Sequence, residues 1–222
     1  VSAIDRLRTS GCLKTLFPRN AEAVEAILIN TSGGLTGGDR LAQVAEAGAG
    51  ARLTLTTQAA ERAYRSASGW ARVDTRLTVL AGGRIDWLPQ ELILFEGARL
   101  QRSLRADLHR DARLLLVEPV IFGRAAMGER LHDAALRDRI EIRRDGVPLY
   151  SDAVRLEGDL TLQMGRPAVG GGAGAMACII YVSADAEGRL AQLRSHLPAT
   201  GGASLLRTDV LVARVLAVDG FT

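Results

Sequence analysis

The stretch NTSGGLTGGD, residues 30–39, decides how this chain is organised, because it sets two glycine pairs close together. Apolar residues lead into it at 26–29, and an alternating run leads out of it at 40–44. Glycine adopts positive φ without steric cost, so paired glycines allow a tight reversal of the backbone. The pattern predicts a strand, a loop and a second strand.

A phosphate-binding loop is excluded at this stretch, although four residues separate Gly33 from Gly38. The positions that need Lys and then Ser or Thr hold Asp39 and Arg40 instead. A carboxylate beside a phosphate would repel it, and no amphipathic helix follows. A glycine turn that only joins two strands remains an open interpretation.

Length and composition indicate a packed core. The chain has 222 residues, of which 47% are hydrophobic and 24% are charged, which fits one large domain or two small ones. Because no linker and no long-period repeat is visible, we expect a single domain over residues 1–222. The chain begins at Val1 without a methionine and stops abruptly at Thr222, so we expect both natural ends to lie outside it.

Charge and cysteine usage exclude several classes of partner. The net charge is only +3, the arginines are scattered and aromatics make up 4%, so we expect no nucleic-acid binding. Cys12 and Cys178 stand far apart, which fits neither a disulfide framework nor a metal site and suits a reducing cytosol. Residues 1–16 are charged throughout, and no run approaches the roughly 18 apolar residues of a membrane helix. We therefore expect a cytoplasmic protein with no membrane contact.

Short alternating runs predict a mainly β fold. Residues 52–56 and 72–80 alternate polar and apolar, which is the period of a half-buried strand. Further runs at 85–88, 92–95 and 114–117 are each closed by Gly, Pro or Asp. This spacing is typical of an all-β body rather than of alternating βαβ units.

One helix is predicted late in the chain. Asp185 is its candidate cap, and Leu190, Leu193 and Leu197 fall on one helical face. Pro198 then ends it.

Two glutamates stand among apolar or glycine neighbours. Glu118 and Glu129 would need an ion pair or hydrogen bonds if they are buried, and Arg124 and Arg130 are the nearest candidate partners. The three histidines are isolated, and the chain has no Gly-x-Ser-x-Gly elbow and no His-Glu-x-x-His motif.

Six blocks of sequence, in order, resemble the urease accessory protein family UreD, also called UreH. The blocks are NTSGGLTGGD at 30–39, TTQAA at 56–60 with YRS at 64–66, WLPQE at 87–91, Phe95 with Gly97 and Ala98, GRAAMGE at 123–129, and RDG at 144–146 with PL at 148–149. The motif residues carried over from the family are Gly33, Gly34, Gly37, Gly38, Asp39, Gln58, Tyr64, Arg65, Ser66, Trp87, Pro89, Gln90, Gly123, Arg124, Gly128 and Glu129. Residues 202–204 and 212–214 fit the family more loosely.

The resemblance implies a chaperone-like scaffold rather than an enzyme, with no tightly bound cofactor. UreD proteins work with UreF and, through UreF, with the GTPase UreG to deliver nickel into apo-urease. The family fold is mainly β, a long wound multi-stranded β-structure (β-helicoid) with one or two α-helices toward the C-terminal part. The family also has a C-terminal helical tail that contributes to UreF contact, and we expect this tail to lie beyond Thr222.

Nickel in transit is the metal role that the resemblance implies. Nickel prefers imidazole and thiolate for tight binding, and three scattered histidines and two cysteines make no dedicated store. A route needs weak, successive oxygen ligands, because a tightly bound ion would not leave. For an internal passage lined by acidic groups, Asp39 is the first candidate, and Glu22 and Asp152 are further ones. Asp39 can equally cap its own loop by accepting backbone N–H groups.

Two other classes of function stay open. A carboxylate-based, metal-dependent hydrolase or lyase would use Asp39, Glu91 and Glu129, and it requires these carboxylates to meet in one open pocket. A scaffold without a metal role would still activate urease after Asp39→Ala, whereas surface substitutions would abolish activation.

Overall fold

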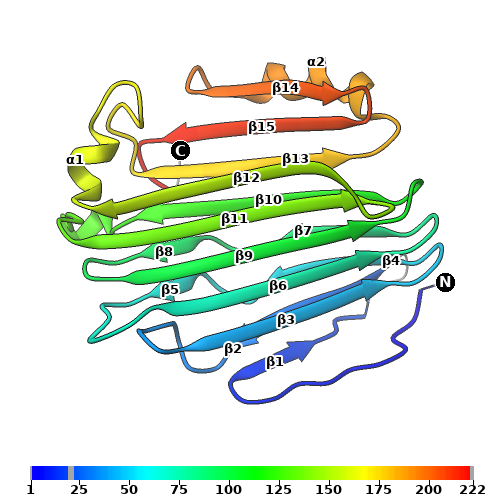
Figure 1. Cartoon of the computed structure of the whole chain (residues 1–222), viewed down its shortest axis with the longest axis horizontal. Helices are drawn as coiled ribbons and strands as arrows, with labels where there is room; N and C mark the ends of the chain where they lie inside the picture. The colour runs from blue at the N-terminus through cyan, green and yellow to red at the C-terminus, as the bar shows by residue number, and fades with distance from the viewer. Residues whose placement is uncertain (1, 20–22, 221–222) are drawn as a thin grey trace.

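The computed structural model describes residues 2–19 and 23–220, which wind through two β-sheets (Figure 1). The path of the large sheet is β1 (Leu13–Leu16), β2 (Val24–Asn30), β4 (Arg52–Thr57), β7 (Arg84–Leu88), β10 (Arg113–Phe122), β13 (Ala175–Val182), β15 (Val210–Ala217) and β14 (Gly201–Arg207), with β5 (Glu61–Ala63) and β8 (Leu92–Leu94) beside it. The small sheet runs β12 (Val147–Gly158), β11 (Ala134–Arg144), β9 (Arg99–Leu108), β6 (Ala71–Val79) and β3 (Arg40–Ala47).

Each turn of the winding adds one parallel strand to each sheet. In the large sheet Arg52, Arg84 and Arg113 lie side by side on β4, β7 and β10. In the small sheet β3, β6, β9 and β11 pair in parallel in the same way. The predicted wound, mainly β fold is therefore confirmed. The turns repeat in space without repeating in sequence, because a strand needs alternation and a closing turn rather than particular residues.

The winding ends after β11, where the chain reverses at Asp145 and Gly146 into the antiparallel strand β12. Two helices follow, α1 (Leu160–Met164) and α2 (Ala186–His196). The predicted leucines pack α2 against Ala203 and Leu211, on the face of the large sheet that points away from the small one. None of the helices among residues 2–19 and 23–220 is long and apolar enough to span a membrane.

The predicted cap of α2 differs in detail. Asp185 occupies the N-cap position, but its carboxylate makes no cap hydrogen bond. It accepts hydrogen bonds from the hydroxyls of Tyr181 and Ser183 and from Arg189 Nε instead. These contacts hold the pKa of Asp185 well below its usual range.

Two apolar clusters fill the space between the sheets, and a layer of ionisable side chains separates them. On β9 the inward residue Leu100 belongs to one cluster and Leu104 to the other, with Arg102 between them. The inner faces of β10 and β11 follow the same pattern, in which one acidic residue stands between an apolar residue of each cluster. That residue is Glu118 on β10 and Asp138 on β11. We call Arg102, Glu118 and Asp138 the ionic layer.

Candidate functional site

The motif block at 144–149 lies in the hairpin between β11 and β12. The other five motif blocks, far apart in the sequence, stack on one another at one edge of the winding. They occupy the turns that lead from the large sheet to the small one, at residues 30–39, 57–70, 88–98 and 123–133, which we call the motif corner. Backbone hydrogen bonds join successive turns, among them Leu35 N–H to Arg62 O at 2.7 Å and Phe95 N–H to Ala63 O at 3.0 Å. Gly123 N–H continues the stack by donating to Leu94 O at 2.8 Å.

One glycine of each pair, Gly34 and Gly37, is required by close approach of the next turn, whereas Gly33 and Gly38 have open space around them and adopt positive φ. A Cβ atom on Gly34 would lie 2.6 Å from the backbone oxygen of Arg62. A Cβ atom on Gly37 would overlap Ser66 Oγ and the backbone oxygen of Ser68. The glycine pairs therefore let adjacent turns of the corner touch, which is a packing role that needs no ligand.

Side chains from three turns form a stack on the surface of the corner. The rings of Tyr64 and Phe95 meet edge to face at 5.1 Å, and the Arg124 guanidinium lies 4.6 Å from the centre of the Phe95 ring. Arg124 also pairs with Glu129 at 2.9 Å, as the sequence suggested, and this lowers the pKa of Glu129. Arg65 lies 3.9 Å from Glu96.

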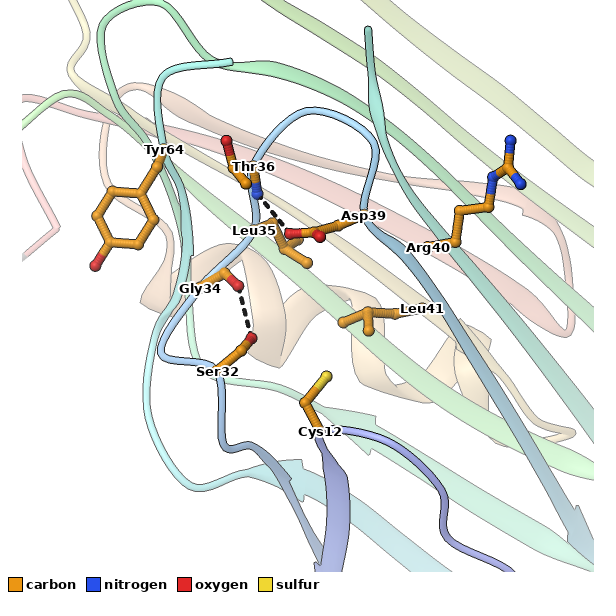
Figure 2. A pocket seen from close by; sticks show the side chains of 9 residues that line it. All are labelled: Cys12, Ser32, Gly34, Leu35, Thr36, Asp39, Arg40, Leu41 and Tyr64. Atoms are coloured by element: carbon orange, nitrogen blue, oxygen red, sulfur yellow. Dashed lines mark hydrogen bonds between the residues drawn. The ribbon is translucent and has the colours of Figure 1, made fainter. Parts of the chain in front are cut away.

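Asp39 lines a hollow of about 330 Å³ beside this corner (Figure 2). Its Oδ2 accepts the backbone N–H of Thr36 at 2.8 Å, so it caps its own loop. Figure 2 shows Leu41 of β3 and the thiol of Cys12 turned toward each other across the hollow. The cap uses one carboxylate oxygen, and the Asp39 carboxylate still faces the hollow.

The ionic layer is a set of three charged side chains that are each less than one fifth exposed. Trp87 Nε1 donates to Glu118 Oε1 at 2.7 Å, and Arg102 pairs with both Glu118, at 2.7 Å, and Asp138. Two carboxylates thus share one guanidinium. Glu118 Oε2 touches Arg102 Nη1 without the alignment of a hydrogen bond and has no hydrogen-bond donor in the described chain. Burial raises the pKa of Glu118 more than the attraction of Arg102 lowers it.

The partners that the sequence suggested for Glu118 are wrong. Arg124 binds Glu129, and Arg102, on another strand, takes the place beside Glu118. Arg124 and Arg130, the nearest arginines in sequence, lie in the motif corner. The winding instead places the inner face of β9, which carries Arg102, opposite the inner face of β10, which carries Glu118. Trp87 belongs to a motif block, but nothing in the sequence indicates its hydrogen bond to Glu118.

A second hollow of about 390 Å³ opens from the ionic layer under β12. Its polar lining includes Glu118, Asp138, Asp152, Cys178 and Arg214, and its apolar lining includes Met164 and Met176. Asp152 forms an ion pair with Arg214 across the space between the sheets. Burial raises the pKa of the Cys178 thiol, which disfavours its thiolate form.

The structure places the predicted metal-route residues apart. Asp39 adjoins β3 and Asp152 lies on β12, and these are the two edge strands of the small sheet. Glu22 lies outside the described residues. In the described chain, no group of three His, Cys, Asp or Glu side chains could hold a metal ion. Asp39 and Asp152 therefore line different hollows.

The carboxylates proposed for an enzyme do not meet in either hollow. Asp39 lines the first hollow, Glu129 is bound by Arg124, and Glu91 lines neither. Of the remaining motif residues, Gln58 is exposed and Gln90 N–H donates to Thr57 Oγ1 at 2.9 Å. The motif residues thus build the corner and one contact of the ionic layer.

Comparison with known proteins identifies the family. The UreD urease accessory protein family matches residues 1–222. The chain is 54% identical over 221 residues to urease accessory protein UreD of Roseobacter denitrificans, covering 99% of this chain and 81% of the relative. It is 51% identical to that of Ruegeria pomeroyi, covering 99% and 86%, and 42% identical to that of Xanthobacter autotrophicus, covering 99% and 76%. The chain therefore belongs to the UreD family of urease accessory proteins.

Proposed function

We propose that this protein is a cytoplasmic scaffold that binds apo-urease and UreF, and UreG through UreF, and assists delivery of nickel to the urease active site. The observation that carries the proposal is the family match over the whole chain, residues 1–222. The relatives are named as urease accessory proteins, which supports a role in maturation rather than in hydrolysing urea.

A route for the ion through the protein is supported by the ionic layer and its hollow. A divalent cation entering beside Asp152 would meet the carboxylates of Asp138 and Glu118 in turn. Each is already engaged by an arginine, so each offers only a weak, shared contact. Weak successive binding lets an ion move on, whereas a closed set of soft ligands would retain it. Asp39 would serve the same purpose at the opposite edge of the small sheet.

A scaffold with no metal role is the second candidate, and one contact favours it. The Asp39 carboxylate accepts the Thr36 N–H, which explains the residue by loop capping alone. In the first candidate the carboxylate binds a passing ion, and in the second it only accepts a backbone hydrogen bond. A substitution that removes the negative charge but keeps the shape and the acceptor oxygen therefore separates the two.

The test is reconstituted activation of urease. Full-length protein is mixed with UreF, UreG, apo-urease, GTP, bicarbonate and nickel, and urea hydrolysis is followed. Asp39→Asn removes one negative charge from the first hollow, and Asp152→Asn removes one from the second. Asp145→Asn is the matched control, because Asp145 lies in an exposed turn with positive φ that asparagine tolerates and lines neither hollow. Complex formation is checked by size-exclusion chromatography.

For the metal route we expect both hollow variants to assemble normally but to activate urease more slowly, with the control unchanged. Equal activation by all variants would contradict the metal route and support a scaffold without a metal role. Failure of the wild type to bind any of the named proteins would overturn the proposed function itself.

A further inference from the structure

The outer face of the small sheet carries a row of arginines across its strands. The strand register places Arg40 beside Arg72, Arg72 beside Gln101, Gln101 beside Arg137 and Arg137 beside Arg155. We call Arg40, Arg72, Arg137 and Arg155 the arginine row. Arg40 adjoins the first hollow, but its side chain is on the exposed face of β3, and its guanidinium extends away from Leu41 and Cys12 (Figure 2). Arg40 and Arg72, and likewise Arg137 and Arg155, thus set two positive charges side by side instead of a positive charge beside a negative one.

Half of the row is partly compensated within the chain, because two arginines share one carboxylate. Arg137 and Arg155 both pair with Glu157, at 2.6 and 2.9 Å, and lower its pKa to about 2. Arg137 also stacks on Trp70, with its guanidinium 4.4 Å from the ring centre. These contacts compensate two like charges that face each other across β11 and β12.

The other half is not compensated. Arg40 and Arg72 are exposed neighbours on β3 and β6, and neither forms an ion pair with any residue in 2–19 or 23–220. Arg76 on the same face is also without an ion pair in that part of the chain, and Val44 beside it is 76% exposed. Like charges directly opposite each other on a sheet destabilise it. A feature that costs stability and has no use inside the fold points to an outside partner.

Other charges on this face indicate what kind of partner fits. Asp74 lies between Arg72 and Arg76 on β6, and Glu46 lies at the far end of β3. Asp107 and Glu141 are bound by Arg105 and by Arg139 and Arg143. A polyphosphate chain would be repelled by these carboxylates, whereas a protein surface can set its own carboxylates on the arginines and avoid the acids. The face also carries the half-buried Trp70, and tryptophan and arginine are residues that dominate protein interfaces.

We propose that the outer face of the small sheet, centred on Arg40 and Arg72, is a docking surface for a partner protein that presents a row of carboxylates. The docking surface rests on the proposed function in one respect, which is that the protein acts within a complex. The surface is one face of a continuous five-stranded sheet, so strand pairing fixes the relative positions of its arginines. The electrostatic contribution speeds encounter and selects the partner by charge.

The test compares two double charge reversals in the full-length protein. Arg40→Glu with Arg72→Glu alters the docking surface. Arg52→Glu with Arg113→Glu is the matched control. These arginines are exposed on the outer face of the large sheet, Arg84 between them is already paired with Asp86, and the change in net charge is the same. Binding to apo-urease and to UreF is measured by biolayer interferometry over a range of salt, with thermal unfolding as the check on folding.

We expect the first variant to weaken binding of one partner about tenfold or more and to flatten its salt dependence, with the control within about twofold of wild type. If both variants bind as wild type does, the docking surface is overturned and the proposed function stands. If the control is the one that loses binding, the partner lies on the large sheet and the proposal is again overturned.

A separate arm judges the surface if neither named protein binds wild type, an outcome that would overturn the proposed function. The probes are then a fluorescent glutamate-rich peptide and a single-stranded DNA oligonucleotide of equal net charge. Tighter binding of the peptide, lost with Arg40→Glu and Arg72→Glu, supports a carboxylate-bearing partner. Tighter binding of the oligonucleotide, or peptide binding that both variants reduce equally, overturns it.

Discussion

At the scale of single residues, the glycines of residues 30–39 act through the side chain that they lack. The sequence showed that two glycine pairs needed a reason, and phosphate binding was excluded by Asp39 and Arg40. The reason became visible only with the next turn in place, since the atoms that exclude a Cβ belong to Arg62, Ser66 and Ser68. No local pattern encodes that contact.

Gly37→Ala tests this packing role. The added Cβ would overlap Ser66 and Ser68, so the turns must separate, and we expect a loss of about 1–3 kcal/mol in the free energy of unfolding. Gly188→Ala is the control, because its Cβ meets no atom within 4 Å and alanine favours helix α2 by up to about 1 kcal/mol. Urea denaturation measures both variants. Equal stability of Gly37→Ala and wild type would contradict the close approach.

Glu118 is the residue whose charge the fold tolerates least. Its pKa is raised in the folded protein, so the folded state favours its protonated form. That contribution to stability is fully present below the pKa of an unfolded glutamate and is lost as pH rises through the folded pKa. The ionised residue therefore weakens the fold near neutral pH.

Glu118→Gln removes the titration and keeps an oxygen that can accept from Trp87 Nε1. We expect its stability relative to wild type to increase from pH 4 to pH 8, because only wild type must ionise a buried carboxyl over that range. Chemical denaturation at several pH values measures the difference. A difference that shrinks as pH rises would show that Arg102 stabilises the charged form instead.

At the scale of elements, the strands were predictable and their order in the sheets was not. Alternation marked residues 52–56 and 72–80 as strands because one face is buried and the other is wet. Helix α1 was not predicted, because five residues are too few to show a helical period. Its one signal in the sequence is the N-cap residue Asp159, whose carboxylate accepts the Leu162 N–H at 2.7 Å. Parallel pairing between turns leaves no mark in the sequence, so the arginine row was seen only as scattered arginines.

Arg72→Glu tests the cost of like charges between β3 and β6. The substitution sets a carboxylate beside Arg40 in place of a second guanidinium, and we expect the protein to gain about 0.2–1 kcal/mol. Arg72→Gln, which only removes the repulsion, should gain less. Both gains should fall as salt is added, because the groups are exposed. Thermal unfolding at low and high salt measures them, and a gain that salt does not reduce would rule out an electrostatic origin.

At the scale of the whole molecule, winding gathers residues that the sequence keeps apart. The ionic layer takes one residue each from β9, β10 and β11, and Asp152 and Arg214 from β12 and β15 adjoin it. The resemblance singled out Asp152, but it could not predict Arg102 or Arg214, because an arginine that forms an ion pair between the sheets looks like any other in a chain with arginines throughout. Whether an ion passes here depends on the hollow that these residues share.

Gly202→Leu tests the hollow by filling it. Gly202 lines the hollow under β12, and a Cβ there meets no atom within 4 Å, so the side chain enters open space without strain. We expect unchanged thermal stability and normal assembly with UreF and apo-urease, but slower nickel-dependent activation, because the space beside Asp152 and Arg214 is reduced. Gly188→Leu adds the same side chain on helix α2, outside both hollows, and should activate as wild type does. Normal activation by Gly202→Leu would mean that the ion takes another path, and the protein would then act on urease through its surfaces alone.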